Sequence, residues 1–385
     1  MKKNLVFIVV LCTALCSCNL SRKYYNPDVQ RDKDLRVCCD TLQLNQVQSE
    51  SADVYKLLCI DNYLVMAQMD RKGLFRVLDI STNEELAVFG QLGHARNEVG
   101  AYPFFDWQIY CIRDDKGQPM LFVQDGVCTK VIDLRKSVAA KKCVVTRVIR
   151  EKKSHFHSTY YLPCQKQFVY KRVSYDDPRD NIFFPPEFSF MDGEEKKWDI
   201  YPDIVEPKDF PQSADADYDH TMIVSPDGQY IASINIFIDI TTIFDLSKKQ
   251  SLGVVNPNSY TYEFLENEIT QSNAHDKIRT YNITACATDK CFIVLESGKT
   301  LKEIDDDEKN ERENRGLKLC GYDWEGNCLF AYCIDKNISN IAYDDVNHKL
   351  YAIDKINGSL YECILKYNDL LMANVEALTS CEIAI

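Results

Sequence analysis

The sequence predicts an all-β protein built from six similar units. Short apolar segments rich in Val, Ile, Tyr and Phe alternate with tight turns along the chain, and helical periodicity is scarce. The first strands of the units are expected at steps of 52, 53, 61, 60 and 58 residues, near Leu57, Ile109, Leu162, Ile223, Ile283 and Ile341. Repeats of this length are typical of a β-propeller, so we expect six blades.

Two units contain especially clear hairpins. Residues 222–233 and 341–353 each hold a strand, a tight turn and a second strand within thirteen residues or fewer. In the first hairpin Pro226 fixes φ, Asp227 can accept hydrogen bonds within the turn, and Gly228 can adopt positive φ. These residues shape the fold rather than a reaction. Further hairpin turns are predicted at Asp115-Lys-Gly, Met191-Asp-Gly and Trp324-Glu-Gly-Asn.

The N-terminus has the pattern of a bacterial lipoprotein signal. Two lysines precede an apolar run over residues 5–15, which is too short for a permanent bilayer span and long enough for a secretory core. The tetrad Leu-Cys-Ser-Cys that ends at Cys18 resembles a lipobox, so Cys18 is expected to be lipidated and to become the new N-terminus. Acyl chains would then anchor the chain to a membrane, since no later apolar run approaches ~20 residues.

We therefore expect a signal peptide over residues 1–17, a lipidated N-terminus and polar tether over 18–36, and a propeller over 37–385. A closed propeller must join its two ends. Either residues 41–48 or residues 381–385 could complete the last blade, and we favour the N-terminal segment. The charged run 302–316 is interpreted as a solvated loop within the fifth blade, with one or two helical turns as the alternative.

Charge and cysteine content limit the partners. With 45 basic and 58 acidic residues the net charge is -13, and phosphate binding needs a concentrated basic face, so nucleic acid is not expected. Seventeen cysteines are present, without a Cys-x-x-Cys pair. Export permits disulfides, but cysteine also serves as a small buried residue, so we expect buried thiols with a few bridges of unassigned connectivity and no zinc site. A bridge between adjacent Cys38 and Cys39 is disfavoured by ring strain.

The chain resembles the TolB-like six-bladed propeller lipoproteins of Bacteroidetes. The lipobox, the six-unit length and the turn over residues 225–229 carry this resemblance, together with Phe-Gly-Gln-Leu-Gly-His-Ala-Arg-Asn-Glu over residues 89–98. That segment is similar to the family's phrase Gly-x-x-Gly-x-Gly-Pro-x-Glu at Gly90, Gly93 and Glu98, and departs from it at Ala95 and Arg96. The resemblance implies a propeller with a backbone bend after the first blade. It implies no particular function, because propellers host many unrelated activities.

Loops that precede the innermost strands of a propeller surround its central channel, where ligands usually lie. The side chains expected there include indole, imidazole, phenol and guanidinium groups, which suit sugars or peptides. The candidate ligand-binding residues are Trp107, His157, Asp219, His220, Arg279, Tyr281 and Asn337, with His155, His275 and Lys336 nearby. The alternative, that these are ordinary loop residues, carries more weight for positions chosen from sequence alone.

The sequence contains only incomplete motifs for metal binding and catalysis. Asp215-Ala-Asp-Tyr-Asp-His begins like a calcium loop, but His220 and Pro226 stand where that motif needs Gly and a bidentate Glu. Residues 90–98 lack the Lys-Ser/Thr of a phosphate-binding loop. No Gly-x-Ser-x-Gly nucleophile elbow occurs in the sequence. A solvated loop at 215–220 is therefore expected, and neither a phosphate-binding loop nor a serine hydrolase.

Three functions remain. The leading hypothesis is a non-enzymatic, lipid-anchored propeller without a cofactor that binds an envelope protein, peptide or glycan. The alternative is a calcium-dependent hydrolase resembling lactonases and gluconolactonases, with Glu98, Asp219 and Asn337 around the ion. A third is a subunit that docks on another envelope protein through blade edges or residues 302–315, in which case channel mutations would be silent.

Sorting signals indicate the outer membrane. Asn19 follows Cys18 where an Asp often retains lipoproteins at the inner membrane. Residues 19–25 lack the acidic pair that resembles the surface-export signal of Bacteroidetes lipoproteins. The periplasmic side is therefore favoured, and the cell surface stays open as the alternative.

Overall fold

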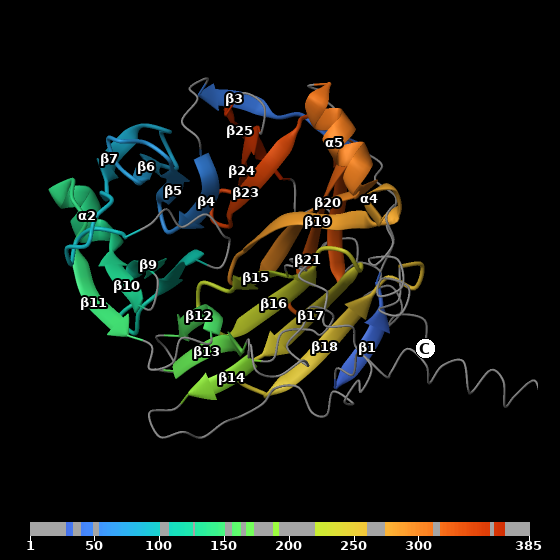
Figure 1. The fold of residues 1–385 in the computed structure, drawn as a ribbon, viewed down its shortest axis with the longest axis horizontal. Helices are drawn as coiled ribbons and strands as arrows, with labels where there is room; N and C mark the ends of the chain where they lie inside the picture. Colours follow the sequence, from blue (N-terminus) through green and yellow to red (C-terminus); the bar gives the residue numbers. More distant parts are fainter. Residues whose placement is uncertain are drawn as a thin grey trace, which may run out of the picture.

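The strands form sheets that radiate from a central axis, as in a propeller (Figure 1). Around this axis the first strand β4 (Val54–Ile60) contacts β8 (Ile109–Arg113) and β23 (Ile338–Asp344), and β19 (Arg279–Ala287) contacts β15 (His220–Val224) and β23. These observations confirm the all-β propeller fold. The computed structural model describes residues 28–33, 40–48, 54–100, 108–125, 128–150, 156–162, 167–172, 188–191, 220–259, 274–310, 316–354 and 358–365.

The first three sheets follow one another along the chain. Sheet 1 contains β4 (Val54–Ile60), β5 (Tyr63–Gln68), β6 (Phe75–Asp79) and β7 (Glu85–Phe89). Sheet 2 contains β8 (Ile109–Arg113), β9 (Pro119–Asp125), β10 (Cys128–Asp133) and β11 (Val145–Arg150). Sheet 3 contains β12 (Phe156–Leu162), β13 (Gln167–Arg172) and β14 (Phe188–Met191).

Three further sheets complete the described part of the fold. Sheet 4 contains β15 (His220–Val224), β16 (Tyr230–Asn235), β17 (Ile240–Asp245) and β18 (Gln250–Val255). Sheet 5 contains β19 (Arg279–Ala287), β20 (Cys291–Thr300), β21 (Leu317–Asp323) and β22 (Cys328–Ile334). Sheet 6 contains β23 (Ile338–Asp344), β24 (Lys349–Asp354) and β25 (Leu360–Ile364).

The predicted repeat can now be compared with the sheets. Each of the six positions expected to mark a first strand lies within the first strand of a sheet. Including strands from the N-terminal segment, five sheets contain four or five strands. Sheet 3 has three strands within the described residues, so it lacks the fourth strand of a complete blade there.

The N-terminal segment crosses three sheets. β1 (Val29–Asp32) lies parallel to β18, and β2 (Asp40–Leu42) lies parallel to β22. β3 (Asn45–Gln48) pairs antiparallel with β25 and supplies the fourth strand of sheet 6, which confirms closure by the N-terminal segment. The predicted tether needs correction, because residues 29–32 belong to sheet 4 and are held there by backbone pairing.

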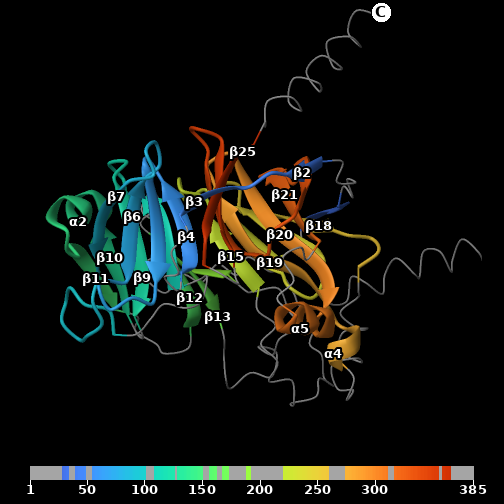
Figure 2. The same ribbon diagram turned by 90° about the horizontal axis from the view of Figure 1, so that it is seen from above.

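The two faces of the propeller carry different connections. Because successive antiparallel strands reverse direction, the first-to-second and third-to-fourth connections of each sheet share one face. We call this the turn face; it includes residues 61–62, 114–118, 134–144, 225–229, 246–249, 288–290, 324–327 and 345–348. The opposite loop face includes residues 69–74, 90–100 and 236–239 with α4 (Ala274–Lys277) and α5 (Leu301–Lys309), which lie together in Figure 2.

Apolar packing between neighbouring sheets forms the core. One cluster joins sheets 1 and 2, where Phe75 and Phe89 have ring centroids 5.7 Å apart. Another joins sheet 2 to sheets 3 and 4, where Tyr110 and Phe122 stack at 4.8 Å. Similar clusters join sheets 4 and 5, 5 and 6, and 6 and 1. Removing such surfaces from water contributes about 25 cal/mol per Å² of apolar area, so contact between sheets is the main stabilising term.

Two helices correct the sequence analysis. For the charged run 302–316 the structure favours the alternative of one or two helical turns over the solvated loop, because the run begins within the helix α5 between two strands of sheet 5. Thr300 and Glu303 explain the helix start: the Thr300 hydroxyl accepts from the Glu303 amide, and the Glu303 carboxylate accepts from the Thr300 amide at 2.8 Å. This reciprocal pair is a capping box. The second helix, α2 (Leu134–Ala140), was not expected, and the Asp133 carboxylate accepts from the Lys136 amide at its start.

The turn and cysteine predictions can be checked within the described residues. Gly228 has φ +71°, and Asp227 Oδ1 accepts from the Gln229 amide at 3.0 Å, as the hairpin chemistry requires. The ten cysteines that the structure describes are all free, and none of them is fully exposed. The expected buried thiols are therefore confirmed. Cys38 and Cys39 and the hairpin predicted at Met191 lie wholly or partly outside the described residues.

Candidate functional site

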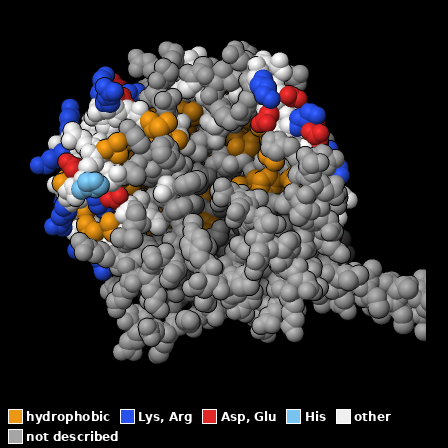
Figure 3. Space-filling view, viewed as in Figure 1, with side chains coloured by type: hydrophobic (Ala, Val, Ile, Leu, Met, Phe, Trp, Pro, Cys, Tyr) orange, Lys and Arg blue, Asp and Glu red, His pale blue; other side chains and the backbone are white. Residues whose placement is uncertain are grey.

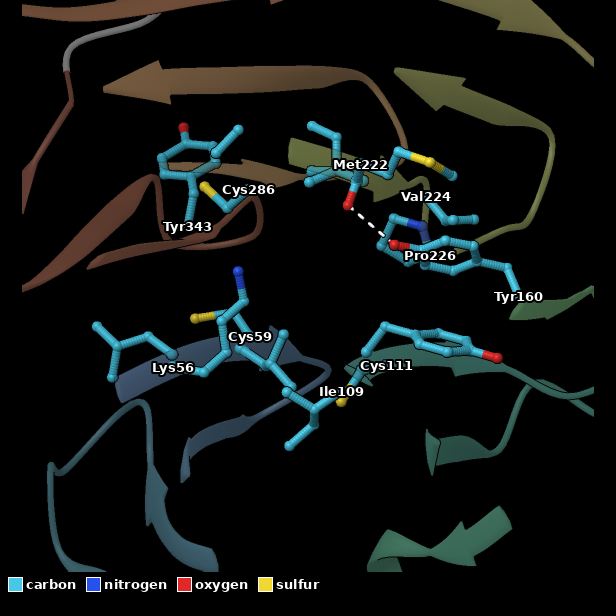
Figure 4. A pocket seen from close by; sticks show the side chains of 16 residues that line it. Lys56, Cys59, Ile109, Cys111, Tyr160, Met222, Val224, Pro226, Cys286 and Tyr343 are labelled. Carbon is cyan, nitrogen blue, oxygen red and sulfur yellow. Dashed lines mark hydrogen bonds between the residues drawn. The ribbon is translucent and has the colours of Figure 1, made fainter. Parts of the chain in front are cut away.

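The inner strands enclose a narrow cavity of about 50 Å³ along the axis. β4, β8, β12, β15, β19 and β23 all contribute to its lining. Figure 4 shows Lys56 and three cysteine side chains, Cys59, Cys111 and Cys286, among apolar groups and the ring of Tyr343. A cavity of this size holds a few water molecules, whereas sites for organic ligands occupy about 300–1,000 Å³.

The channel thiols are protonated under ordinary conditions. Burial raises the pKa of Cys59, of Cys111 and of Cys286 well above the usual thiol range. Neighbouring Cys286 and Cys111 raise the pKa of Cys59 further. The thiolate is the nucleophile and the metal ligand, so these groups have the chemistry of small apolar residues.

An arginine spans the axis at the turn face. Arg113, at the end of β8, donates from Nε to Asp61 Oδ1 at 3.1 Å and from Nη1 to Asp289 Oδ2 at 2.8 Å. Asp61 lies in the β4–β5 turn and Asp289 in the β19–β20 turn. Sheets 2 and 5 are separated by two sheets in either direction around the ring, so the Arg113–Asp289 pair crosses the axis.

The charges around Arg113 act on one another. Burial raises the pKa of Asp289 above its ordinary value, although Arg113 opposes the shift, and Asp227 and Asp345 contribute to it. Burial lowers the pKa of Arg113, but Asp289 and Asp61 outweigh burial and raise it overall. Carboxylates from several sheets therefore surround one guanidinium group and neutralise it.

The predicted bend after the first sheet is a compact loop on the loop face. Gly90 has φ +83°, and the Glu98 carboxylate accepts from the Ala95 amide at 3.0 Å. A Cβ added at Gly93 would meet the Glu98 carboxylate, so glycine is required for this close approach. Glu98, offered above as a calcium ligand, therefore holds its own loop.

A buried lysine fixes this loop from beneath. Lys130 Nζ lies 2.8 Å from Asp125 Oδ2 and also donates to the Glu98 carbonyl. Asp125 in turn accepts from the Gly100 amide at 2.9 Å. The Lys130 side chain is 7% exposed. The sequence analysis missed Lys130, and the only signal was one cation among the apolar residues of β10.

The upper side of the loop faces solvent. Leu92 is 44% exposed, and His94 and Arg96 are also exposed. Met69, in the β5–β6 connection on the same face, is 41% exposed. Figure 3 shows the loop face, with hydrophobic and basic side chains at its left side, over sheets 1 and 2. Exposed apolar and basic side chains therefore lie on this face.

The predicted rim residues have different placements. Arg279 begins β19, is exposed, and donates to the Gly298 carbonyl at 2.6 Å, while Tyr281 in the same strand is half-buried. Asn337 is 1% exposed, so burial removes it from the open rim where it was expected, and its Nδ2 lacks a hydrogen-bond partner. Lys336 lies 6.0 Å from the Tyr361 ring centroid.

Other candidates lie wholly or partly outside the described residues. Trp107, Asp219 and His155 are not described, and the side chains of His157 in β12, His220 in β15 and His275 in α4 are not described either. Among the described residues, no group of three or more His, Cys, Asp or Glu side chains has a metal-binding arrangement. Within the same residues, the structure contains no helix with the length and apolar character needed to cross a membrane.

Comparisons with known proteins support the fold. The chain is similar to a solved member of the DUF4221 family from Bacteroides vulgatus, with a TM-score of 0.54, 8% identity, and coverage of 84% of this chain and 96% of that one. Weaker matches include a luciferin-regenerating enzyme (TM-score 0.43, 9% identity, 84% and 95% coverage). Another is the Myceliophteria thermophila Cps50 (Swd1) β-propeller domain (0.39, 12%, 83% and 99%). No family model and no curated protein matches the chain.

Proposed function

We propose that this protein is a non-enzymatic β-propeller, lipid-anchored through Cys18 at the outer membrane, that binds an envelope protein or peptide through its loop face. We propose further that it is a member of the TolB-like six-bladed lipoproteins of Bacteroidetes, with sheet 3 as the sixth blade. Its body faces the periplasm, or alternatively the cell surface. Neither a cofactor nor nucleic acid takes part.

The narrow channel is the observation that carries this proposal. About 50 Å³ of space, lined by apolar groups, protonated thiols and Lys56, is too small for a sugar or lactone. Arg113 and its carboxylate partners span the axis at the turn face. Recognition is therefore assigned to the outer surface, where the loop over residues 90–100 is rigid and exposes Leu92, His94 and Arg96.

Site-specific photocrosslinking in living cells tests the binding surface. A photoreactive residue is placed at His94 on the loop face and, as the matched control, at Asn347, which is exposed on the turn face. The expected result is one discrete crosslinked product at His94 and none at Asn347, lost when Leu92 and Arg96 are changed to Ser. Equal crosslinking at both positions, or none at His94, would contradict the assigned surface.

Metal analysis tests the alternative hydrolase. The purified lipoprotein is unfolded thermally with calcium and with a chelator, and its metal content is measured. We expect equal melting temperatures, because an ion bound only to the folded state would stabilise it according to occupancy. Stoichiometric calcium and a large drop with chelator would overturn the non-enzymatic proposal in favour of the calcium-dependent hydrolase.

A further inference from the structure

The direction of β1 shows where the N-terminal chain reaches the propeller. Val29 pairs with Leu252 and Asp32 with Val255 in parallel register, so β1 and β18 start at the same face. β18 begins directly after the connection 246–249, which belongs to the turn face. The Asp28 carboxylate accepts from the Ser251 amide at 2.7 Å and fixes this position. The chain therefore enters the propeller at the turn face.

The distance between this point and the proposed anchor is short. Cys18 and Asp28 are ten positions apart (28 − 18). At roughly 3.5 Å per residue, the chain between them spans about 35 Å at most. A membrane that holds acyl chains on Cys18 is thus within reach of the turn face beside sheet 4.

Exposed cations lie on the same face, in sheet 4 next to this point and in sheet 2 farther around the ring. The connection 134–144 in sheet 2 and the connection 246–249 in sheet 4 contain no acidic residue. Together they expose six cationic side chains, Arg135, Lys136, Lys141, Lys142, Lys248 and Lys249. The equivalent connections in sheets 1 and 5 instead expose Glu84 and Glu325. The basic connections stand out in a protein of net charge -13.

Local ion pairs leave much of this charge directed outward. Lys136 pairs with Asp133 at 2.8 Å, but its side chain is 69% exposed while Asp133 is 12% exposed. Lys248 pairs with Asp245 in the same way, at 2.7 Å with 67% and 14% exposure. In both pairs the carboxylate lies inward and the ammonium group lies at the surface. An anionic surface that approaches these two connections meets ammonium groups first.

We propose that the turn face, tilted toward its sheet 2 and sheet 4 connections, rests on anionic phospholipid headgroups of the membrane that holds Cys18. This inference depends on the proposed lipid anchor and adds an orientation: the loop face with its partner-binding residues points away from the bilayer. Lysine and arginine near an anionic leaflet are attracted within about a Debye length, which is ~10 Å at 0.1 M salt.

Lysine acetylation read by mass spectrometry tests the orientation. The full acylated protein is reconstituted in phosphatidylcholine vesicles with or without phosphatidylglycerol. We expect Lys136, Lys141, Lys142, Lys248 and Lys249 to react more slowly when phosphatidylglycerol is present, and Lys72 and Lys302 on the loop face to react at one rate throughout. High salt should abolish the protection, because screening weakens headgroup attraction and leaves the tether intact.

Charge-matched variants separate headgroup binding from mere proximity. In the first variant Lys141, Lys142, Lys248 and Lys249 are changed to Gln, which should remove the protection of Lys136. In the second, the same number of charges is removed from the loop face by changing Arg71, Lys72, Lys302 and Lys309 to Gln, which should leave it unchanged. Protection that is equal in neutral vesicles, or equal on both faces, would overturn the inference.

Detergent-phase partitioning distinguishes this failure from failure of the anchor. If the protein partitions into the detergent phase but its two faces are acetylated alike, the anchor stands and the orientation is wrong. If it stays in the aqueous phase and incorporates no palmitate, the anchor proposal fails and the orientation falls with it.

Discussion

Two cation-centred junctions join different sheets, and they differ in burial. Lys33, just after β1, donates to Asp239 of sheet 4 at 2.6 Å and to Glu296 of sheet 5 at 2.7 Å, with 7% of its side chain exposed. Arg113 joins sheets 1, 2 and 5 with 32% of its side chain exposed. The first junction holds the N-terminal segment against sheets 4 and 5, and the second spans the axis at the turn face.

Burial makes the Lys33 junction the more consequential of the two. Water screens Arg113 and its partners, so each pair contributes little net stability. Around Lys33 there is little water to solvate a carboxylate that loses its partner, so an incomplete junction is costly. The carboxylates of Asp239 and Glu296 outweigh burial and raise the pKa of Lys33, so the lysine stays charged.

The largest expected effect is that of Lys33→Met. It leaves buried Asp239 and partly buried Glu296 without their cation and should lower the free energy of unfolding by about 3–5 kcal/mol, measured by chemical denaturation. Lys72→Met, at an exposed position, is the matched control and should change little. Adding Asp239→Asn and Glu296→Gln to Lys33→Met should recover much of the loss. No recovery would show that the junction acts through packing instead of charge.

Lys130 is a second buried lysine, so Lys130→Met tests whether burial also makes the loss of this cation costly. It removes the lysine from Asp125, which keeps its hydrogen bond from the Gly100 amide, and should cost about 2 kcal/mol of folding free energy. The same change should release residues 91–99, which faster hydrogen exchange of the Val99 amide would report, since that amide donates to the Gln91 carbonyl. Unchanged exchange would mean that Glu98 and the glycines hold the loop alone.

Arg113→Met should have a smaller effect, about 1 kcal/mol, because its ion pairs are partly exposed. High salt should narrow the difference between wild type and this variant and leave the Lys33→Met difference almost unchanged. A loss as large as that of Lys33→Met would break the comparison, because it would show that a partly exposed junction is as consequential as a buried one.

The smallest expected effect is the pH dependence of Asp289. Its pKa is raised in the folded protein, so the folded state binds this proton more tightly than the unfolded state does. Its contribution to stability is complete below the ordinary Asp pKa of about 3.9 and is lost as the pH rises through the folded-state value. As the pH rises through the folded-state pKa of Asp289, the free energy of unfolding of Asp289→Asn should therefore increase relative to that of wild type. Denaturation curves at successive pH values would show this difference.

Prediction from sequence succeeded where the signal was local. Strand propensity predicted the positions of the strands. Turn propensity and the conformational freedom of glycine predicted the Pro226 turn and the bend between Gly90 and Glu98, because these properties depend only on residues close in sequence. The helix α5, which the sequence offered only as an alternative, also carried a local signal, since Thr300 and Glu303 form a capping box. The dense charge over residues 302–316 favoured a solvated loop instead.

The sequence by itself determined the all-β repeat and the spacing of the first strands, because periodic strands and turn chemistry depend on neighbouring residues. It left closure open between the two ends of the chain, which the pairing of β3 with β25 decided. Only the tertiary structure decided that Lys33 is a buried clasp and not part of a tether. It alone placed Arg113 across the axis and Asn337 below the surface. These placements join residues up to 263 positions apart. Such contacts depend on how sheets pack around the axis, which no local pattern encodes.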